Sequence, residues 1–112
     1  MAIHKVFIPE ERFSDCRIIK KAKEWINSEL VETDTTEDFK GAVFNLNRQD
    51  LKLLMEQGIN ITIDDKKIYC YRDINLMETV EFKGKQYSVV SGKEYMIHDE
   101  LRIYYIQRIK NE

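Results

Sequence analysis

Few side chains in this chain of 112 residues have the types and spacing that catalysis or metal binding requires. The histidines, His4 and His98, lie far apart, and neither has a Cys, Asp or Glu at a recognised zinc-ligand spacing, whereas zinc takes three or four such ligands. The acids between Glu29 and Asp38 lack the alternating Asp/Asn ladder, central Gly and distal Glu of a calcium loop. We therefore predict no metal site, and a solvated loop for these acids.

Nucleophilic and nucleotide chemistry have equally little support. Ser88, Ser91 and His98 fall in one predicted hairpin region, but no nucleophile elbow or oxyanion-type glycine motif accompanies them. All four glycines lie at predicted turns, and none belongs to a phosphate-cradling motif. Cys16 and Cys70 have no Cys-x-x-Cys spacing, so we expect buried, reduced thiols, with a disulfide as the weaker alternative. We predict no catalytic residue, no cofactor and no enzymatic activity.

The length and composition fit one globular domain over residues 1–112, with residues 1–13 as the candidate for an N-terminal arm. A chain of this length buries about two-thirds of its unfolded surface in one core. No apolar stretch approaches the roughly 18 residues that span a bilayer. Residues Met1 to Pro9 lack the apolar run and cleavage site of a signal peptide. We expect a cytoplasmic protein that does not enter membranes.

Charge is distributed unevenly along the chain. Residues 1–23 carry a net charge of +3, residues 24–38 carry −6 with no base, and the remainder carries +1. Domains that bind nucleic acid normally have a basic excess, because each phosphate contact needs a Lys or Arg, and this chain has none. An acidic segment facing a DNA channel would instead repel phosphate. The candidates for such a segment are Glu29, Glu32, Asp34, Glu37 and Asp38.

The N-terminal half fits a pair of strands better than a helix. Read as strands, the segment from Asp15 to Asp38 forms a first β pair with the polar loop Thr33 to Thr36 at its far end. Read as a helix, Ile18, Ala22 and Trp25 would share a stripe at 3.6-residue spacing. The Val and Phe content of the next segment, up to Leu46, favours extended chain.

A short helix follows, from Asn47 to Gln57. Asn47 is a good N-cap, Asp50 sits at the capping-box position, and Gly58 is a C-terminal stop. The apolar residues at positions i, i+3 and i+4 are Leu51, Leu54 and Met55.

Short alternating runs separated by turn signals predict further strands. These runs are Ile59 to Ile63, Ile68 to Tyr71, Val80 to Phe82, Tyr87 to Val90 and Leu101 to Ile109. Gly84 suits a hairpin turn and Gly92 marks the next break. The last run has apolar residues on both faces, which is typical of a strand covered on both sides. The predicted fold class is mainly β, a small antiparallel β-barrel or sandwich with one short α-helix.

This order of elements resembles the head-tail joining proteins of tailed bacteriophages, also called head closure, head completion or stopper proteins. The likeness covers roughly residues 14–110, and its most specific part is the pattern Val-x-Phe-x-Gly-x-x-Tyr-x-Val from Val80 to Val89. Glu78-Thr79 stands where the family usually has Gly-Asp, so the turn before Val80 is expected to be built differently. The other segments that carry the likeness are Phe39 to Asn45, Asn47 to Gln57, Lys67 to Tyr71 and Leu101 to Ile109.

The resemblance implies a small β-barrel with a long, mobile hairpin or loop, assembling as a ring beneath the portal and its adaptor after DNA packaging. Such a protein would be a non-enzymatic virion component that closes the channel and presents a surface to the tail. Its partners would be portal, adaptor and tail proteins and further copies of itself, with viral DNA passing without sequence-specific binding. It would occur in the host cytoplasm during assembly and then at the head-tail interface. Contact candidates are Leu53, Met55, Tyr104 and Ile106.

Three other functions remain open at this point. A tail terminator or another virion interaction protein would have a similar small fold and a different neighbour. A small barrel that binds single-stranded nucleic acid would use Tyr69, Tyr71 and Tyr87 as stacking platforms, although the acidic balance argues against it. An enzyme ranks last, because no cluster of convergent polar groups is evident in the sequence.

Overall fold

The computed structural model of the chain describes residues 8–62, 64–94 and 101–109. Its elements are the 3₁₀ turn η1 (Glu10–Arg12), the strands β1 (Ser14–Ile26), β2 (Glu29–Asn45), β3 (Lys66–Cys70), β4 (Thr79–Phe82), β5 (Lys85–Glu94) and β6 (Arg102–Arg108), and the helix α1 (Arg48–Glu56). The predicted fold class, mainly β with one short helix, is confirmed.

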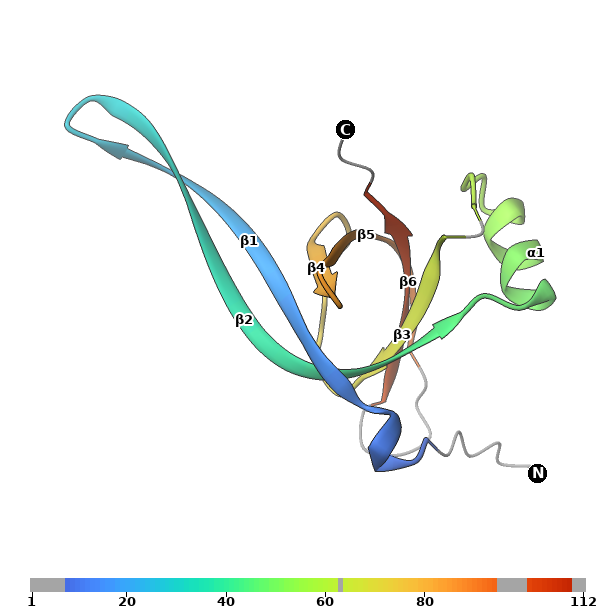
Figure 1. Cartoon of the computed structure of the whole chain (residues 1–112). Coiled ribbons are helices and arrows are strands. Elements are labelled where there is room, and N and C mark those ends of the chain that lie inside the picture. Colours follow the sequence, from blue (N-terminus) through green and yellow to red (C-terminus); the bar gives the residue numbers. More distant parts are fainter. Residues whose placement is uncertain (1–7, 63, 95–100, 110–112) are drawn as a thin grey trace.

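The strands form one closed barrel in the order β1-β2-β3-β6-β5-β4, and every pair is antiparallel (Figure 1). The closing seam between β1 and β4 is short, since only Arg17, Ile18 and Ile19 of β1 pair with β4. Closure removes most exposed strand edges from the barrel. It also decides between the two predicted architectures in favour of the barrel.

The apolar residues form two clusters on opposite sides of the sheet. The barrel interior contains Ile18 of β1, Val80 of β4 and Ile106 of β6, each at most 1% exposed. The second cluster lies outside the barrel, where Leu54 of α1 packs on Ile103 and Tyr105 of β6. Strand β6 is therefore covered on both faces, as its sequence predicts. Each fully buried aliphatic side chain contributes about 1.5–3 kcal/mol of transfer free energy.

Strands β1 and β2 continue far beyond the barrel as a two-stranded ribbon (Figure 1). We call residues 20–35 the arm, because these residues pair only with each other in the β1–β2 hairpin, whereas Ile19 still pairs with β4. The seven arm residues of β1 span roughly 23 Å at strand rise. The arm accounts for the elongated shape of the chain, 60 × 29 × 25 Å.

The position of the turn in this hairpin corrects the sequence prediction. Residues Thr33–Thr36 lie inside β2, and the chain turns instead at Asn27 and Ser28, whose φ angles are 51° and 68°. Two consecutive residues with positive φ are typical of the type I′ turn, whose twist matches that of the flanking strands. Threonine is a β-branched residue that favours strands, so a threonine-rich stretch suits β2 better than a loop.

Two further predictions are wrong in detail. Residues 59–62 do not form a strand, because Ile59 and Ile61 pack instead against the Leu54 cluster, and Ile63 lies outside the described residues. Gly92 lies inside β5 rather than at a break. A Cβ atom at Gly92 would come within 2.8 Å of the Tyr104 ring, so the glycine makes room for that ring on the neighbouring strand.

The turn next to the family-like pattern is also built on positive φ. Met77, with φ 72°, donates its backbone N–H to the Val89 carbonyl, and Glu78 accepts a hydrogen bond from the Asn75 backbone N–H at 2.8 Å. The hairpin between β4 and β5 turns at Lys83 and Gly84, as predicted from Gly84.

Candidate functional site

The end of the arm carries three large apolar side chains that are exposed to solvent. Trp25, Ile26 and Leu30 surround the Asn27–Ser28 turn and are 75%, 45% and 51% exposed. We call these three residues the tip. Trp25 and Leu30 are register partners, so their side chains lie on the same face of the ribbon. Tryptophan is enriched at protein interfaces because it offers a large rigid apolar surface and one polar N–H.

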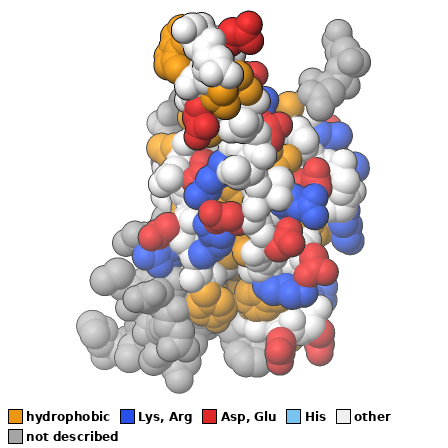
Figure 2. All heavy atoms as spheres, turned by 90° about the vertical axis from the view of Figure 1, so that its left-hand side faces the viewer, with side chains coloured by type: hydrophobic (Ala, Val, Ile, Leu, Met, Phe, Trp, Pro, Cys, Tyr) orange, Lys and Arg blue, Asp and Glu red, His pale blue; other side chains and the backbone are white. Residues whose placement is uncertain are grey.

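Below the tip, the β1–β2 hairpin carries a ladder of opposite charges across its two strands. Figure 2 looks onto the arm and shows apolar atoms at its end, with basic and acidic side chains intermixed along the ribbon. Ion pairs across the two strands, with their N···O distances, are Arg17–Asp38 at 3.1 Å, Lys20–Glu37 at 3.4 Å and Lys23–Glu32 at 3.9 Å. The register also sets Lys21 opposite Asp34.

This ladder changes the interpretation of the acidic segment. The predicted loop is wrong, because Glu29, Glu32, Asp34, Glu37 and Asp38 all lie on strand β2. Its charge is also partly compensated by bases that are distant in sequence. Glu37 accepts hydrogen bonds from Arg72 and Lys20, which lower the pKa of its carboxyl below the ordinary value. Near the tip, Glu24 and Glu29 form no ion pair with another described residue.

A buried polar cluster attaches α1 to the barrel at the side away from the arm. The Asp50 carboxylate accepts a hydrogen bond from Lys67 Nζ at 2.8 Å and one from the Tyr105 hydroxyl at 3.3 Å. It also accepts from the Asn47 backbone N–H, while the Asn47 side chain accepts from the Asp50 N–H, which confirms the predicted capping box. The side chains of Asp50 and Lys67 are only 10% and 13% exposed. The cluster therefore fixes the orientation of α1 on β3 and β6.

With Leu54 turned toward the barrel, the opposite side of α1 faces solvent. Leu51 and Met55 are 36% and 70% exposed, and they line a shallow hollow of about 520 Å³ with Arg48, Lys52 and Glu56. We call these five residues the outer face of α1. The predicted apolar stripe is thus split, since Leu54 alone of its three residues is buried.

The four predicted contact residues are in different environments. Met55 is exposed on the outer face of α1, and Leu53 packs beside the Leu54 cluster. Ile106 is in the barrel core, and Tyr104 packs against that core while its hydroxyl accepts the Ile74 N–H at 3.0 Å. The structure thus leaves Met55 as the most accessible of the four.

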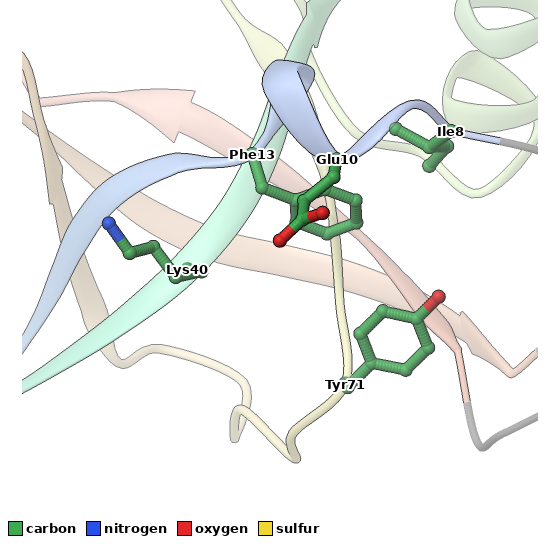
Figure 3. A pocket seen from close by; sticks show the side chains of 5 residues that line it. All are labelled: Ile8, Glu10, Phe13, Lys40 and Tyr71. Carbon is green, nitrogen blue, oxygen red and sulfur yellow. The ribbon is translucent and has the colours of Figure 1, made fainter.

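A second hollow, of about 620 Å³, lies where η1 meets β2 and the end of β3. Figure 3 shows its lining, Ile8, Glu10, Phe13, Lys40 and Tyr71. The rings of Phe13 and Tyr71 stack with centroids 5.9 Å apart and planes at 22°. Lys40 is already paired with Asp15 across the β1–β2 ladder. We call this hollow the aromatic cleft.

The residues considered for chemistry are not gathered into a reaction site. Within residues 8–62, 64–94 and 101–109 no cluster of His, Cys, Asp and Glu could hold a metal ion, and His4 and His98 lie outside these ranges. Ser91 donates a hydrogen bond to the Gln57 side chain at 2.9 Å. Cys16 and Cys70 are free and buried, as predicted. Burial raises the pKa of both thiols, that of Cys16 to about 11, which keeps them protonated and unreactive.

The tyrosines do not form a common stacking surface. Tyr87 is 3% exposed and belongs to the barrel core, whereas Tyr69 lies half-buried on the outer side of β3 and Tyr71 is exposed beside Phe13. Single-strand binding by stacking requires several exposed rings along one basic groove. Tyr69, Tyr71 and Tyr87 do not meet this requirement.

Sequence reasoning missed the tip, although Trp25 and Leu30 are plain in the sequence. Their exposure depends on where the barrel closes, and that seam is set by pairing between β1 and β4 across more than fifty residues. The dipeptide Asn27-Ser28 was the available signal, because Asn tolerates positive φ better than most residues.

Comparison with known proteins supports the fold. No family model and no curated protein matches the chain. The solution structure of protein SF1141 from Shigella flexneri 2a is similar, with a TM-score of 0.61 and 16% sequence identity. The match covers 90% of this chain and 96% of that protein. At this identity the likeness establishes a shared architecture over nearly the whole chain.

No helix within the described residues is long and apolar enough to span a bilayer.

Proposed function

We propose that this chain is a structural subunit of the head-tail connector of a tailed phage or prophage, a head closure protein that acts through contacts rather than catalysis. The observation that carries the proposal is a small closed barrel from which a two-stranded arm projects roughly 23 Å and ends in exposed Trp25, Ile26 and Leu30. Such a form suits a subunit that reaches its neighbours across an assembly.

The resemblance in sequence supports the same role. The pattern from Val80 to Val89 occupies the β4–β5 hairpin, and α1 follows β2 in the order that the family-like segments require. The partners in this proposal are portal or adaptor proteins on one side, tail proteins on the other and further copies of the chain around a ring. Viral DNA passes through the ring without sequence-specific binding.

The distribution of charge is compatible with DNA passing close to the arm. Along β2, Glu32, Glu37 and Asp38 are paired with bases of β1, so the ribbon has neither a basic track that would hold phosphate nor a continuous acidic track. The arm as a whole carries three bases and four acids, a slight negative excess.

The test is electron microscopy of particles from a host that carries the source genome with this gene disrupted, beside the intact control. The connector role predicts tailless heads that have lost DNA, together with separate, complete tails. Normal tailed particles from the disrupted genome would contradict it. Mass spectrometry of separated heads and tails then distinguishes a head closure protein, which remains with the heads, from a tail terminator, which remains with the tails.

A further inference from the structure

We propose that the tip of one copy docks on the outer face of α1 of a second copy, so that neighbouring subunits join head to tail. This inference deepens the proposed function, on which its place in a ring rests. The contact itself is argued from surfaces within this chain.

No apolar surface of the described residues covers the tip. Trp25, Ile26 and Leu30 lie at the end of a ribbon that leaves the barrel at Ile19, so the arm carries them away from the barrel core (Figure 1). A two-stranded ribbon in water is marginally stable, and the cross-strand pair Trp25–Leu30 adds only about 0.2–1 kcal/mol to it. Contiguous exposed apolar side chains of this kind mark protein contact sites.

The charges near the tip indicate which of the exposed apolar surfaces it binds. Glu24 and Glu29 flank the tip without an ion pair to another described residue, so the tip prefers a surface with free bases. On the outer face of α1, Arg48 and Lys52 border Leu51 and Met55 and likewise form no ion pair with another described residue, and these two bases exceed the single acid of this face, Glu56.

The competing surfaces have fewer bases without an ion pair. In the aromatic cleft, Lys40 is paired with Asp15, and Glu10 adds a negative charge. The hollow beside exposed Leu76 and Met77 contains the acid Glu78 and two bases. Lys20 is paired with Glu37, and Lys21 faces Asp34 in the hairpin register without an ion pair to it. Charge complementarity therefore favours the outer face of α1.

The placement of the two surfaces supports a contact between copies. The tip and α1 lie at opposite sides of the molecule, so the tip of a chain cannot meet its own helix (Figure 1). A contact between two different surfaces of identical chains is heterologous, and it produces a closed ring when the rotation between subunits permits closure. In such a ring the tip of each subunit binds one neighbour, and its α1 binds the tip of the other neighbour.

The chain provides an intrinsic probe for this contact, since Trp25 is its single tryptophan. We expect the fluorescence of the full-length protein to shift to shorter wavelength as its concentration rises to about 1 mM, which half-populates even a millimolar contact. Sedimentation equilibrium over the same range should give masses above that of the monomer. A monomer at all concentrations, with fully exposed Trp25, would overturn the inference.

Charge reversal tests which surfaces meet. Glu24→Lys/Glu29→Lys changes the tip and Arg48→Glu/Lys52→Glu changes the helix, and all four side chains are exposed, so both variants should fold. Each variant alone should associate at least about tenfold more weakly than the wild type. Mixed together, they should associate again as assemblies in which the two variants alternate, because each tip is then complementary in charge only to the helix of the other variant.

A matched control is Leu76→Ser/Met77→Ser, which removes exposed apolar residues elsewhere and should leave association unchanged. Association that persists in both charge-reversed variants, or mixtures that stay monomeric, would overturn the inference. The inference and the proposed function can fail separately. Charge-reversed variants that still give normal particles contradict the tip contact alone, whereas normal particles without the gene contradict the connector role.

Discussion

The two halves of the β1–β2 hairpin share one ladder of backbone pairing and have opposite surroundings. Near the barrel, Cys16 and Ile18 lie in the core, 3% and 0% exposed, whereas Trp25 and Ile26 on the same strand are exposed in the arm. The difference follows from where β4 stops pairing with β1, at Ile19. Apolar residues on one strand therefore serve stability before this point and are available for contact with another molecule after it.

The interactions that maintain each half also differ. The barrel half relies on apolar burial, whereas the arm relies on the backbone ladder and on exposed charge pairs such as Lys23–Glu32. Exposed pairs contribute only about 0–1 kcal/mol each. The arm should consequently be the first part of the hairpin to open, while the barrel half remains closed.

Truncating the same residue type in the two halves should give the largest difference. Ile18→Ala removes a fully buried side chain and should cost about 2–5 kcal/mol in free energy of unfolding. Ile26→Ala, in the arm, should cost less than about 1 kcal/mol because Ile26 is already 45% exposed. Urea unfolding of both variants provides the measurement. Equal losses in free energy of unfolding would show that the arm contributes to stability as much as the core does.

Carboxylate replacement should distinguish buried from exposed ion pairs. Asp50→Asn leaves the nearly buried Lys67 ammonium without its counter-ion and should cost about 3 kcal/mol. Asp38→Asn, which removes the exposed partner of Arg17, should change stability by less than about 1 kcal/mol. Hydrogen exchange should show faster exchange across α1 in the first variant alone. Unchanged α1 protection would contradict the role of Asp50 as the helix attachment.

Alkaline pH should weaken the barrel half. Burial raises the pKa of Cys16 from 9.0 to about 11, so the folded thiol keeps its proton where the unfolded one has lost it. The unfolded state then binds fewer protons, and stability must fall as pH rises from 9 to 11. Burial also raises the pKa of Cys70, Tyr87 and Tyr104, and these groups change the stability in the same direction.

The measurement is the free energy of unfolding by urea from pH 8 to 11, for the wild type and for Cys16→Ala. The variant should show a shallower decline, although its stability at pH 8 is lower. Glu37, in the exposed ladder, has a lowered pKa and gives no dependence in this range, because it is fully ionised in both states. Parallel declines in the two proteins would refute the contribution of Cys16.

The smallest effect on folding should come from the tip. Trp25→Ala/Leu30→Ala removes two exposed side chains that contact no core, so the free energy of unfolding should change by less than about 1 kcal/mol. Circular dichroism and urea midpoints close to those of the wild type are the expected result. A large loss of stability would mean that the tip packs against its own barrel.

Local signals predicted much of the fold. The cap residues Asn47 and Asp50 set the start of α1, and the two apolar faces of β6 followed from alternation at Ile103 to Ile106. Both predictions depend on residues that are close to one another in the sequence. The β4–β5 hairpin was equally local, because Gly84 permits the required positive φ.

The candidate site depends on pairing between distant residues, which is why the sequence did not reveal it. The acids of β2 lie in a stretch of sequence without bases, and the strand register places Lys20 and Lys23 beside them. The exposure of Trp25 required the position of the β1–β4 seam. Leu53, Met55, Tyr104 and Ile106 were chosen from apolar character alone, which does not separate a core residue from a contact residue.

In the proposed connector, the arm acts on other subunits while the barrel supports it. The most direct measurement is electron microscopy of particles assembled with Trp25→Ala/Leu30→Ala in place of the wild-type chain, after the purified variant has been shown to fold. We predict tailless heads and separate tails, although the variant is as stable as the wild type. Tailed, DNA-filled particles indistinguishable from the control would contradict the claim.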